Sequence, residues 1–128
     1  MIKWLEKNKI ASVVMLLLIG VEIFYFSSLP GVPGAGGNPW IARIYHLVVF
    51  FLFAFFILAS IKGIKKLTTK TYISALIISI IYAILDEFHQ IFVPGRDGSI
   101  RDFMTDTIGI FFAVLIYFYI SKKSKQST

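Results

Sequence analysis

Acidic, imidazole and guanidinium side chains crowd into one short segment, DEFHQIFVPGRDGSIRDFMTD, which covers residues 86–106. Carboxylates and imidazoles at such short spacing can act as general acids and bases or as ligands of a divalent cation. Arginines beside a helix start can bind a phosphate or a carboxylate. Because apolar stretches flank the segment on both sides, the pattern predicts a polar site between two apolar helices.

The elements that must position this site are four apolar stretches, each long enough to cross a membrane. They cover residues 10–28, 44–61, 72–92 and 103–120. At about 1.5 Å per residue, each stretch reaches across a hydrocarbon core of roughly 30 Å. The composition agrees, since 57% of the residues are hydrophobic and the mean hydropathy is +0.79. We therefore expect an all-α integral membrane protein, a four-helix bundle that forms a single domain over residues 1–128.

The basic residues are distributed unevenly along the chain. All the lysines lie before the first stretch, between the second and third, or after the fourth, whereas the other two connections carry only Arg43, Arg96 and Arg101. The positive-inside rule then places both termini in the cytoplasm and residues 86–106 at the extracytoplasmic face. Topology thus explains the basic charge, which argues against a nucleic-acid partner and makes the lipid bilayer the expected one. The absence of cysteine excludes disulfides and thiolate ligands.

The polar side chains inside the four stretches fall into one layer near the predicted outer face. They are Glu22, His46, Asp86, Glu87, His89, Gln90, Asp102 and Asp106. A charge among lipid tails costs several kcal/mol, so such residues normally face one another or a wet cavity. We therefore expect them to meet in a polar pocket that is open to the outside.

Helical spacing indicates which faces carry the polar groups. One stripe of the third stretch holds Ser79, Tyr82, Ala83, Asp86, His89 and Gln90, with Glu87 on its flank and Ile84, Phe88 and Phe92 opposite. One stripe of the fourth stretch holds Asp102, Asp106, Gly109 and Ala113. Because small residues permit close packing of helices in lipid, we expect these two helices to touch along their stripes.

The connection between the third and fourth stretches predicts a tight antiparallel turn. Pro94 and Gly95 end the third helix, since proline disfavours helix before it and glycine accepts unusual φ values. Ser99 is the predicted N-cap of the fourth helix, with Asp102 at the capping-box position. Arg96 and Arg101 then lie near a helix start, where they can bind an anion.

These motifs together resemble the VanZ-like family. The pattern is D-E-F-H-Q, then P-G-R, then D-x-x-x-D-x-x-G, with S-S-L-P after the first stretch and R-x-x-H opening the second. The resemblance implies a small multi-pass protein of the bacterial plasma membrane, whose namesake is associated with resistance to the glycopeptide antibiotic teicoplanin. It implies a site without roles at Arg43, His46, Asp86, Glu87, His89, Gln90, Pro94, Gly95, Arg96, Asp102, Asp106 and Gly109.

A binding role is the first of three classes of function that fit these residues. The outward-facing pocket would engage an anionic lipid-linked cell-wall precursor or a glycopeptide, and so contribute to glycopeptide tolerance. The ligand contacts would be Arg43, Arg96, Arg101, Gln90, Glu22 and Asp102. A transporter or proton relay is a further class, which we disfavour because the inner half of every stretch is almost uniformly apolar.

A membrane-embedded hydrolase or transferase acting on a lipid-linked phosphate or sugar is the alternative class. Its catalytic group would comprise His46, Asp86, Glu87, His89 and Asp106, with a carboxylate as general base, a histidine as acid and Arg96 as phosphate clamp. A metal-dependent variant places a divalent cation among His46, His89, Asp86 and Asp106.

Overall fold

The computed structural model describes residues 2–30, 38–63 and 66–126, and within these ranges the regular secondary structure is helical. A short helix α1 (Ile2–Lys7) precedes the long helices α2 (Lys9–Ser28), α4 (Pro39–Lys62), α5 (Thr69–Ile91) and α6 (Ile100–Gln126). Each of these four long helices is apolar enough to cross a membrane. The predicted all-α class and the four spans are therefore confirmed for the described residues.

Capping residues make three of the helices longer than the apolar pattern predicts. The Asn38 side chain accepts a hydrogen bond from the Trp40 N–H and starts α4 five residues before the expected boundary. Thr68 forms a reciprocal capping box with Thr71 and starts α5. The Asp102 N–H donates to the Ser99 hydroxyl at 3.3 Å, which confirms Ser99 as the N-cap of α6. Caps lie outside the hydrocarbon core, where hydropathy carries no signal.

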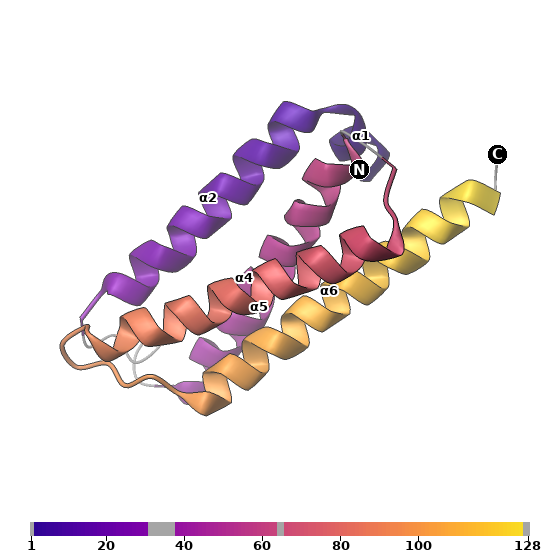
Figure 1. The fold of residues 1–128 in the computed structure, drawn as a ribbon. Helices are drawn as coiled ribbons and strands as arrows, with labels where there is room; N and C mark the ends of the chain where they lie inside the picture. Colours follow the sequence, from indigo (N-terminus) through magenta and orange to yellow (C-terminus); the bar gives the residue numbers. More distant parts are fainter. Residues whose placement is uncertain (1, 31–37, 64–65, 127–128) are drawn as a thin grey trace.

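The first helix α1 is a feature that the sequence pattern did not predict. Asn8 separates it from α2, and the Ser12 hydroxyl of α2 donates to the Leu5 carbonyl at 2.7 Å. The Tyr117 hydroxyl of α6 donates to Glu6 Oε1 at 3.0 Å. These contacts hold the beginning of the chain against the end of the bundle at which α6 finishes (Figure 1).

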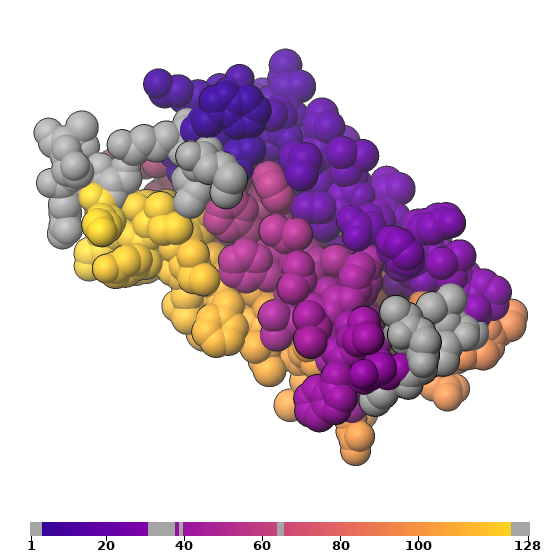
Figure 2. Space-filling model, turned by 180° about the vertical axis from the view of Figure 1, so that it is seen from behind, coloured from indigo at the N-terminus to yellow at the C-terminus, as the bar shows by residue number. Residues whose placement is uncertain are grey.

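Helix α4 is the central element of the bundle. Figure 2 shows the magenta atoms of α4 between those of α2 and α6. In Figure 1, α5 lies in front of α4. Phe50 and Leu58 of α4 have no exposed surface. The other three long helices expose a broad apolar face, which includes Ile84 and Phe88 of α5 and the Phe92 that follows it, as predicted. Such faces suit contact with lipid tails.

Gly109 sets the contact between α4 and α6. A Cβ atom at this position would overlap the Leu47 carbonyl and lie 3.3 Å from the Phe51 nitrogen, so the two backbones approach as closely as glycine permits. Helices α5 and α6 pack against each other as expected, but Gly109 and Asp86 of their polar stripes contact other helices. The α6 stripe faces α4, and the α5 stripe reaches α2, because Asp86 hydrogen-bonds Ser27.

The chain ends and the polar turn lie at opposite ends of the bundle. Figure 1 places both labelled termini at one end, and the α5–α6 connection with the end of α2 at the other. Four spans require this arrangement, since an even number of crossings returns the chain to its starting side. The polar residues predicted to form one layer thus gather at the end remote from the termini. We call this the polar end.

Candidate functional site

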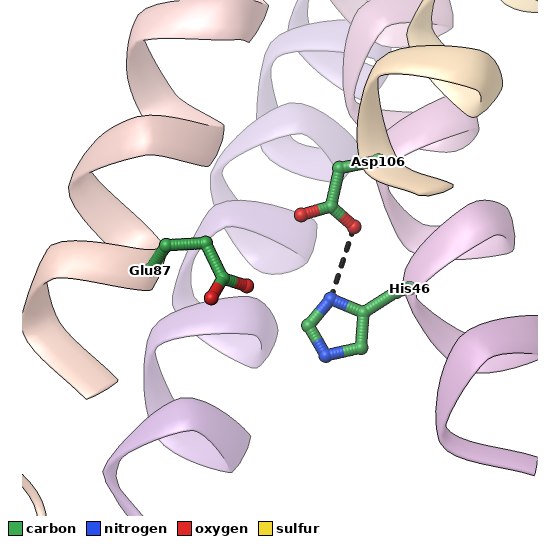
Figure 3. A group of neighbouring side chains, drawn as sticks. All are labelled: His46, Glu87 and Asp106. Carbon is green, nitrogen blue, oxygen red and sulfur yellow. Dashed lines mark hydrogen bonds and ion pairs between the residues drawn. The ribbon is translucent and has the colours of Figure 1, made fainter. Parts of the chain in front are cut away.

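Three side chains from three helices converge at the polar end (Figure 3). His46 comes from α4, Glu87 from the end of α5 and Asp106 from the second turn of α6. His46 Nδ1 lies 3.0 Å from Asp106 Oδ1, and one metal-binding atom from each of the three residues lies within 4.8 Å of the others. We call these three residues the Asp106 cluster. The close α4–α6 contact at Gly109, one turn along, brings His46 and Asp106 together.

His46 and Asp106 of the Asp106 cluster are enclosed by the helices, whereas Glu87 is half-buried. His46 is 6% exposed and Asp106 is 0% exposed. An ionised Asp106 can only accept a hydrogen bond, so His46 Nδ1 is the donor to Oδ1, and Nε2 is left to gain or lose a proton. An imidazole oriented by a buried carboxylate can serve acid–base chemistry or metal binding.

Glu87 is held in place by the start of α6. The Ser99 N–H donates to Glu87 Oε2 at 2.6 Å, so Glu87 takes the position that a capping-box residue would occupy. The predicted capping-box role of Asp102 is therefore wrong. Gly98 permits this approach, because a Cβ atom there would lie 2.8 Å from Ile91 Cγ1 and 3.1 Å from the Glu87 carbonyl.

One oxygen of each carboxylate in the Asp106 cluster has no hydrogen-bond partner among the described residues. Glu87 Oε1 and Asp106 Oδ2 are buried and accept no hydrogen bond from the described part of the chain. Figure 3 shows both carboxylates directed into the space between the helices. Buried polar atoms are normally paired, so two unpaired acceptors in one cluster indicate that a further group belongs there.

Asp86 lies in a second group, between α5 and α2, and this group is fully paired. The Ser27 hydroxyl donates to Asp86 Oδ1 at 2.5 Å, and Gln90 Nε2 donates to Oδ2 at 2.9 Å. All three residues are buried. Together with Ser28 and His89 they form what we call the Asp86 cluster.

His89 extends the Asp86 cluster towards the lipid-facing side of α2. The Ser28 hydroxyl donates to the Phe24 carbonyl at 2.7 Å, so its oxygen accepts the hydrogen bond that joins it to His89 Nε2 at 2.9 Å. The His89 ring also stacks on Phe24, with ring centroids 4.9 Å apart. The sequence analysis did not predict Ser27 and Ser28 as hydrogen-bond partners of Asp86 and His89. Two hydroxyl side chains at the outer end of the first stretch could have indicated them.

Arg96 binds the end of α2. Its Nη2 donates to the Phe26 carbonyl at 2.7 Å and its Nε to the Leu29 carbonyl at 3.2 Å. The last carbonyls of a helix lack intrahelical partners, and a cation there also complements the helix dipole. In this structure the Arg96 guanidinium therefore closes the polar end by joining the α5–α6 connection to α2.

The remaining predicted contacts lie around the two clusters. The Arg43 guanidinium lies 5.1 Å from the centroid of the Trp40 ring, a cation–π contact. Arg101 is exposed and Asp102 is half-buried at the start of α6. Glu22 is exposed and forms no salt bridge within the described ranges. None of these four residues joins either cluster.

The structure regroups the four residues predicted to hold a metal. His46 and Asp106 lie together, whereas Asp86 and His89 belong to the other cluster, and Glu87 takes their place beside His46. The polar groups are also packed between helices, which differs from the expected open pocket. A pocket of about 250 Å³ does reach Glu87, and Ser99 and Phe103 line it as well.

Comparison with known proteins identifies a family. A family model described as VanZ/LLP1 matches residues 3–121, a range that includes both clusters and the Arg96 contact. No curated protein and no solved structure matches the chain. The family match confirms the resemblance drawn from the motifs.

Proposed function

The chain belongs to the VanZ/LLP1 family, and on that premise we propose that it engages an anionic lipid-linked cell-wall precursor at the polar end. In this proposal the protein resides in a bacterial plasma membrane with its polar end outside the cytoplasm. Engagement of the precursor, or of the glycopeptide that targets it, contributes to tolerance of teicoplanin-type antibiotics.

An apolar groove beside the Asp86 cluster is the observation that carries this proposal. The groove has a volume of about 430 Å³ and is lined by Leu17, Gly20, Phe24, Phe53 and Tyr82, among others, from α2, α4 and α5. Phe24 lines the groove and also stacks on His89. A prenyl chain lying in the groove would therefore bring its phosphate to the polar end, where imidazoles and arginines are available.

The charge distribution supports the outward orientation of the polar end. The end with the termini carries the lysines, and the polar end carries the three arginines. The positive-inside rule favours the lysine-rich side as cytoplasmic. Lipid-linked cell-wall precursors and glycopeptides meet at the outer surface, so this orientation makes the polar end accessible to both.

Lipid binding by the purified full chain tests the proposal. We expect the protein in detergent to bind a long-chain prenyl phosphate at least tenfold more tightly than the matching uncharged prenol. Gly20→Leu, which fills the groove, should weaken binding of both lipids. Equal affinity for the phosphate and the prenol would contradict the proposal.

A membrane-embedded phosphatase is a second candidate, and the geometry of the Asp106 cluster favours it. His46 is oriented by Asp106 at 3.0 Å, and Glu87 offers a second carboxylate nearby. Glu87 would accept a proton from water as the water attacks phosphorus, and His46 would protonate the leaving lipid oxygen. The products would be a lipid alcohol and inorganic phosphate.

Phosphate release distinguishes the enzyme from the binding protein. A phosphatase should release inorganic phosphate from prenyl phosphate in repeated turnovers, and Glu87→Gln should lower the rate at least a hundredfold. Stable binding of prenyl phosphate without release would exclude the enzyme and leave the binding role.

A further inference from the structure

The polar end has more negative than positive side chains. Of the seven Asp and Glu residues, only Glu6 lies at the other end, which leaves six carboxyl groups beside Arg43, Arg96 and Arg101. Arg96 is already bound to backbone carbonyls and Arg43 packs on Trp40. An anionic ligand would therefore meet net negative charge unless a cation is present.

The Asp106 cluster has the ligand atoms that such a cation requires. A divalent cation about 2.1 Å from two ligand atoms at a right angle holds them about 3.0 Å apart. His46 Nδ1 and Asp106 Oδ1 are joined by a hydrogen bond of 3.0 Å in this structure, so a cation that replaces the Nδ1 proton finds them at this separation. The third residue, Glu87, has a metal-binding atom within 4.8 Å of theirs, so closure around an ion needs only small side-chain movements.

Two further observations indicate a cation. Glu87 Oε1 and Asp106 Oδ2 are buried acceptors without a donor in the described residues, and Asp106 has no exposed surface. Two carboxylates also balance the charge of one divalent ion, which lowers the cost of burying all three charges together. The Ser99 N–H in turn fixes Glu87 by donating to Oε2, which leaves Oε1 directed at the cluster.

We propose that His46, Glu87 and Asp106 bind one divalent first-row cation, of which Mn²⁺ and Zn²⁺ are the types that suit one imidazole and two carboxylates. Three protein ligands leave coordination positions free for an oxygen of an anionic headgroup. This last step rests on the proposed function, because it makes the cation the counter-charge for the lipid-linked phosphate. The cation site itself does not depend on that function.

Titration with Mn²⁺ tests the cation site. The full chain in detergent is first treated with a chelator, and free Mn²⁺ is then followed by its electron paramagnetic resonance signal. We expect one Mn²⁺ bound for each chain. Glu87→Gln and Asp106→Asn should each weaken binding at least tenfold, whereas Asp97→Asn, which changes an exposed carboxylate at the same end, should stay within twofold. Absence of Mn²⁺ binding, or equal binding by all four proteins, would overturn the inference.

Thermal unfolding shows whether the Glu87→Gln and Asp106→Asn variants still fold. The amide carbonyl introduced by Glu87→Gln can still accept from the Ser99 N–H, and the one introduced by Asp106→Asn can still accept from His46. Both variants should therefore unfold thermally like the metal-free parent. If Asp106→Asn does not fold, Glu87→Gln decides the test.

Lipid binding with and without a chelator separates this inference from the proposed function. We expect Mn²⁺ to raise affinity for prenyl phosphate at least tenfold and to leave affinity for the prenol unchanged. Tight phosphate binding that the chelator does not alter would overturn the role of the cation and leave the proposed function intact. Mn²⁺ binding without any preference for the phosphate would contradict the function and leave the cation site intact.

Discussion

The two clusters at the polar end use similar side chains and differ in hydrogen bonding. In the Asp86 cluster both carboxylate oxygens accept hydrogen bonds, from Ser27 and Gln90. In the Asp106 cluster one oxygen of Asp106 and one of Glu87 remain without a donor among the described residues. The first arrangement is complete within the protein, whereas the second leaves two acceptors unpaired among the described residues, which is why we propose a cation there.

Hydrogen bonding thus distinguishes a buried carboxylate that holds helices together in a membrane from one that can bind a ligand. A buried carboxylate that is saturated by neighbouring helices contributes to stability, because removing it leaves its donors unpaired. A buried carboxylate with a free oxygen costs stability, and a ligand that binds this oxygen would offset the cost. Stability and binding should therefore respond oppositely to changes in the two clusters.

The largest effect should come from breaking the contact that assembles the Asp106 cluster. In Gly109→Ala the new methyl group overlaps the Leu47 carbonyl, so α4 and α6 must separate. We expect a loss of about 2 to 3 kcal/mol in the free energy of unfolding, measured by denaturant titration in detergent. Gly20→Ala is the matched control, since its Cβ would lie 3.5 Å from Phe53 in ordinary contact. Equal stability of the two variants would contradict the close packing at Gly109.

The same Asp→Asn substitution should affect stability differently in the two clusters. Asp86→Asn places an amide N–H₂ against Ser27 or Gln90, which are themselves donors, and should lower the free energy of unfolding by about 1 kcal/mol. Asp106→Asn keeps an acceptor for His46 and can donate its free N–H₂ towards Glu87, so the metal-free protein should be as stable as the parent or more stable. Thermal unfolding in the presence of chelator measures both. A larger loss for Asp106→Asn would remove the distinction between the clusters.

Arg96 tests the contact that joins the α5–α6 connection to the end of α2. Arg96→Lys replaces two hydrogen bonds from separate nitrogens with one point charge and should cost about 1 kcal/mol. Hydrogen exchange should report it as faster exchange at the end of α2. Asp97→Ala is the control, because Asp97 is an exposed neighbour and its change should leave exchange there unaltered. Equal exchange in both variants would exclude the capping role.

The smallest effect should come from a single hydrogen bond in the Asp86 cluster. Ser27→Ala leaves Asp86 Oδ1 without its donor while Gln90 still serves Oδ2. Interhelical hydrogen bonds in membranes contribute roughly 0.6 kcal/mol on average, so we expect a loss of that order in the free energy of unfolding. Unchanged stability would indicate that water replaces the Ser27 hydroxyl.

The sequence predicts the elements and the polar layer for physical reasons. Hydropathy reports the hydrocarbon core, so it locates the four spans, and helical periodicity reports the lipid-facing side, so it places Phe88 and Phe92 correctly. The gathering of His46, Asp86 and Asp106 at one end follows from their depth in the spans. The turn also follows, since Gly95 has φ 77°, a value that glycine accepts readily.

The neighbours of each helix could not be predicted from these patterns. A stripe shows which face is buried and carries no information about the helix that covers it, so the sequence does not show that Asp86 pairs with α2 and Asp106 with α4. Gly109 is recognisable as a small residue, but its partner Leu47 lies in α4, far away in the sequence. Contacts to the backbone could not be predicted either. Every residue has a carbonyl, so residue types do not show which carbonyls Arg96 binds.

Sidedness of the polar end is the most direct test of the account. The chain lacks cysteine, so Asp97→Cys and Lys70→Cys each provide one exposed thiol, at the polar end and at the other end respectively. In intact cells a membrane-impermeant maleimide should label the Asp97→Cys variant, and it should label the Lys70→Cys variant only after the membrane is permeabilised. Labelling of the Lys70→Cys variant alone in intact cells would place the polar end in the cytoplasm and contradict the proposed engagement of an external cell-wall precursor.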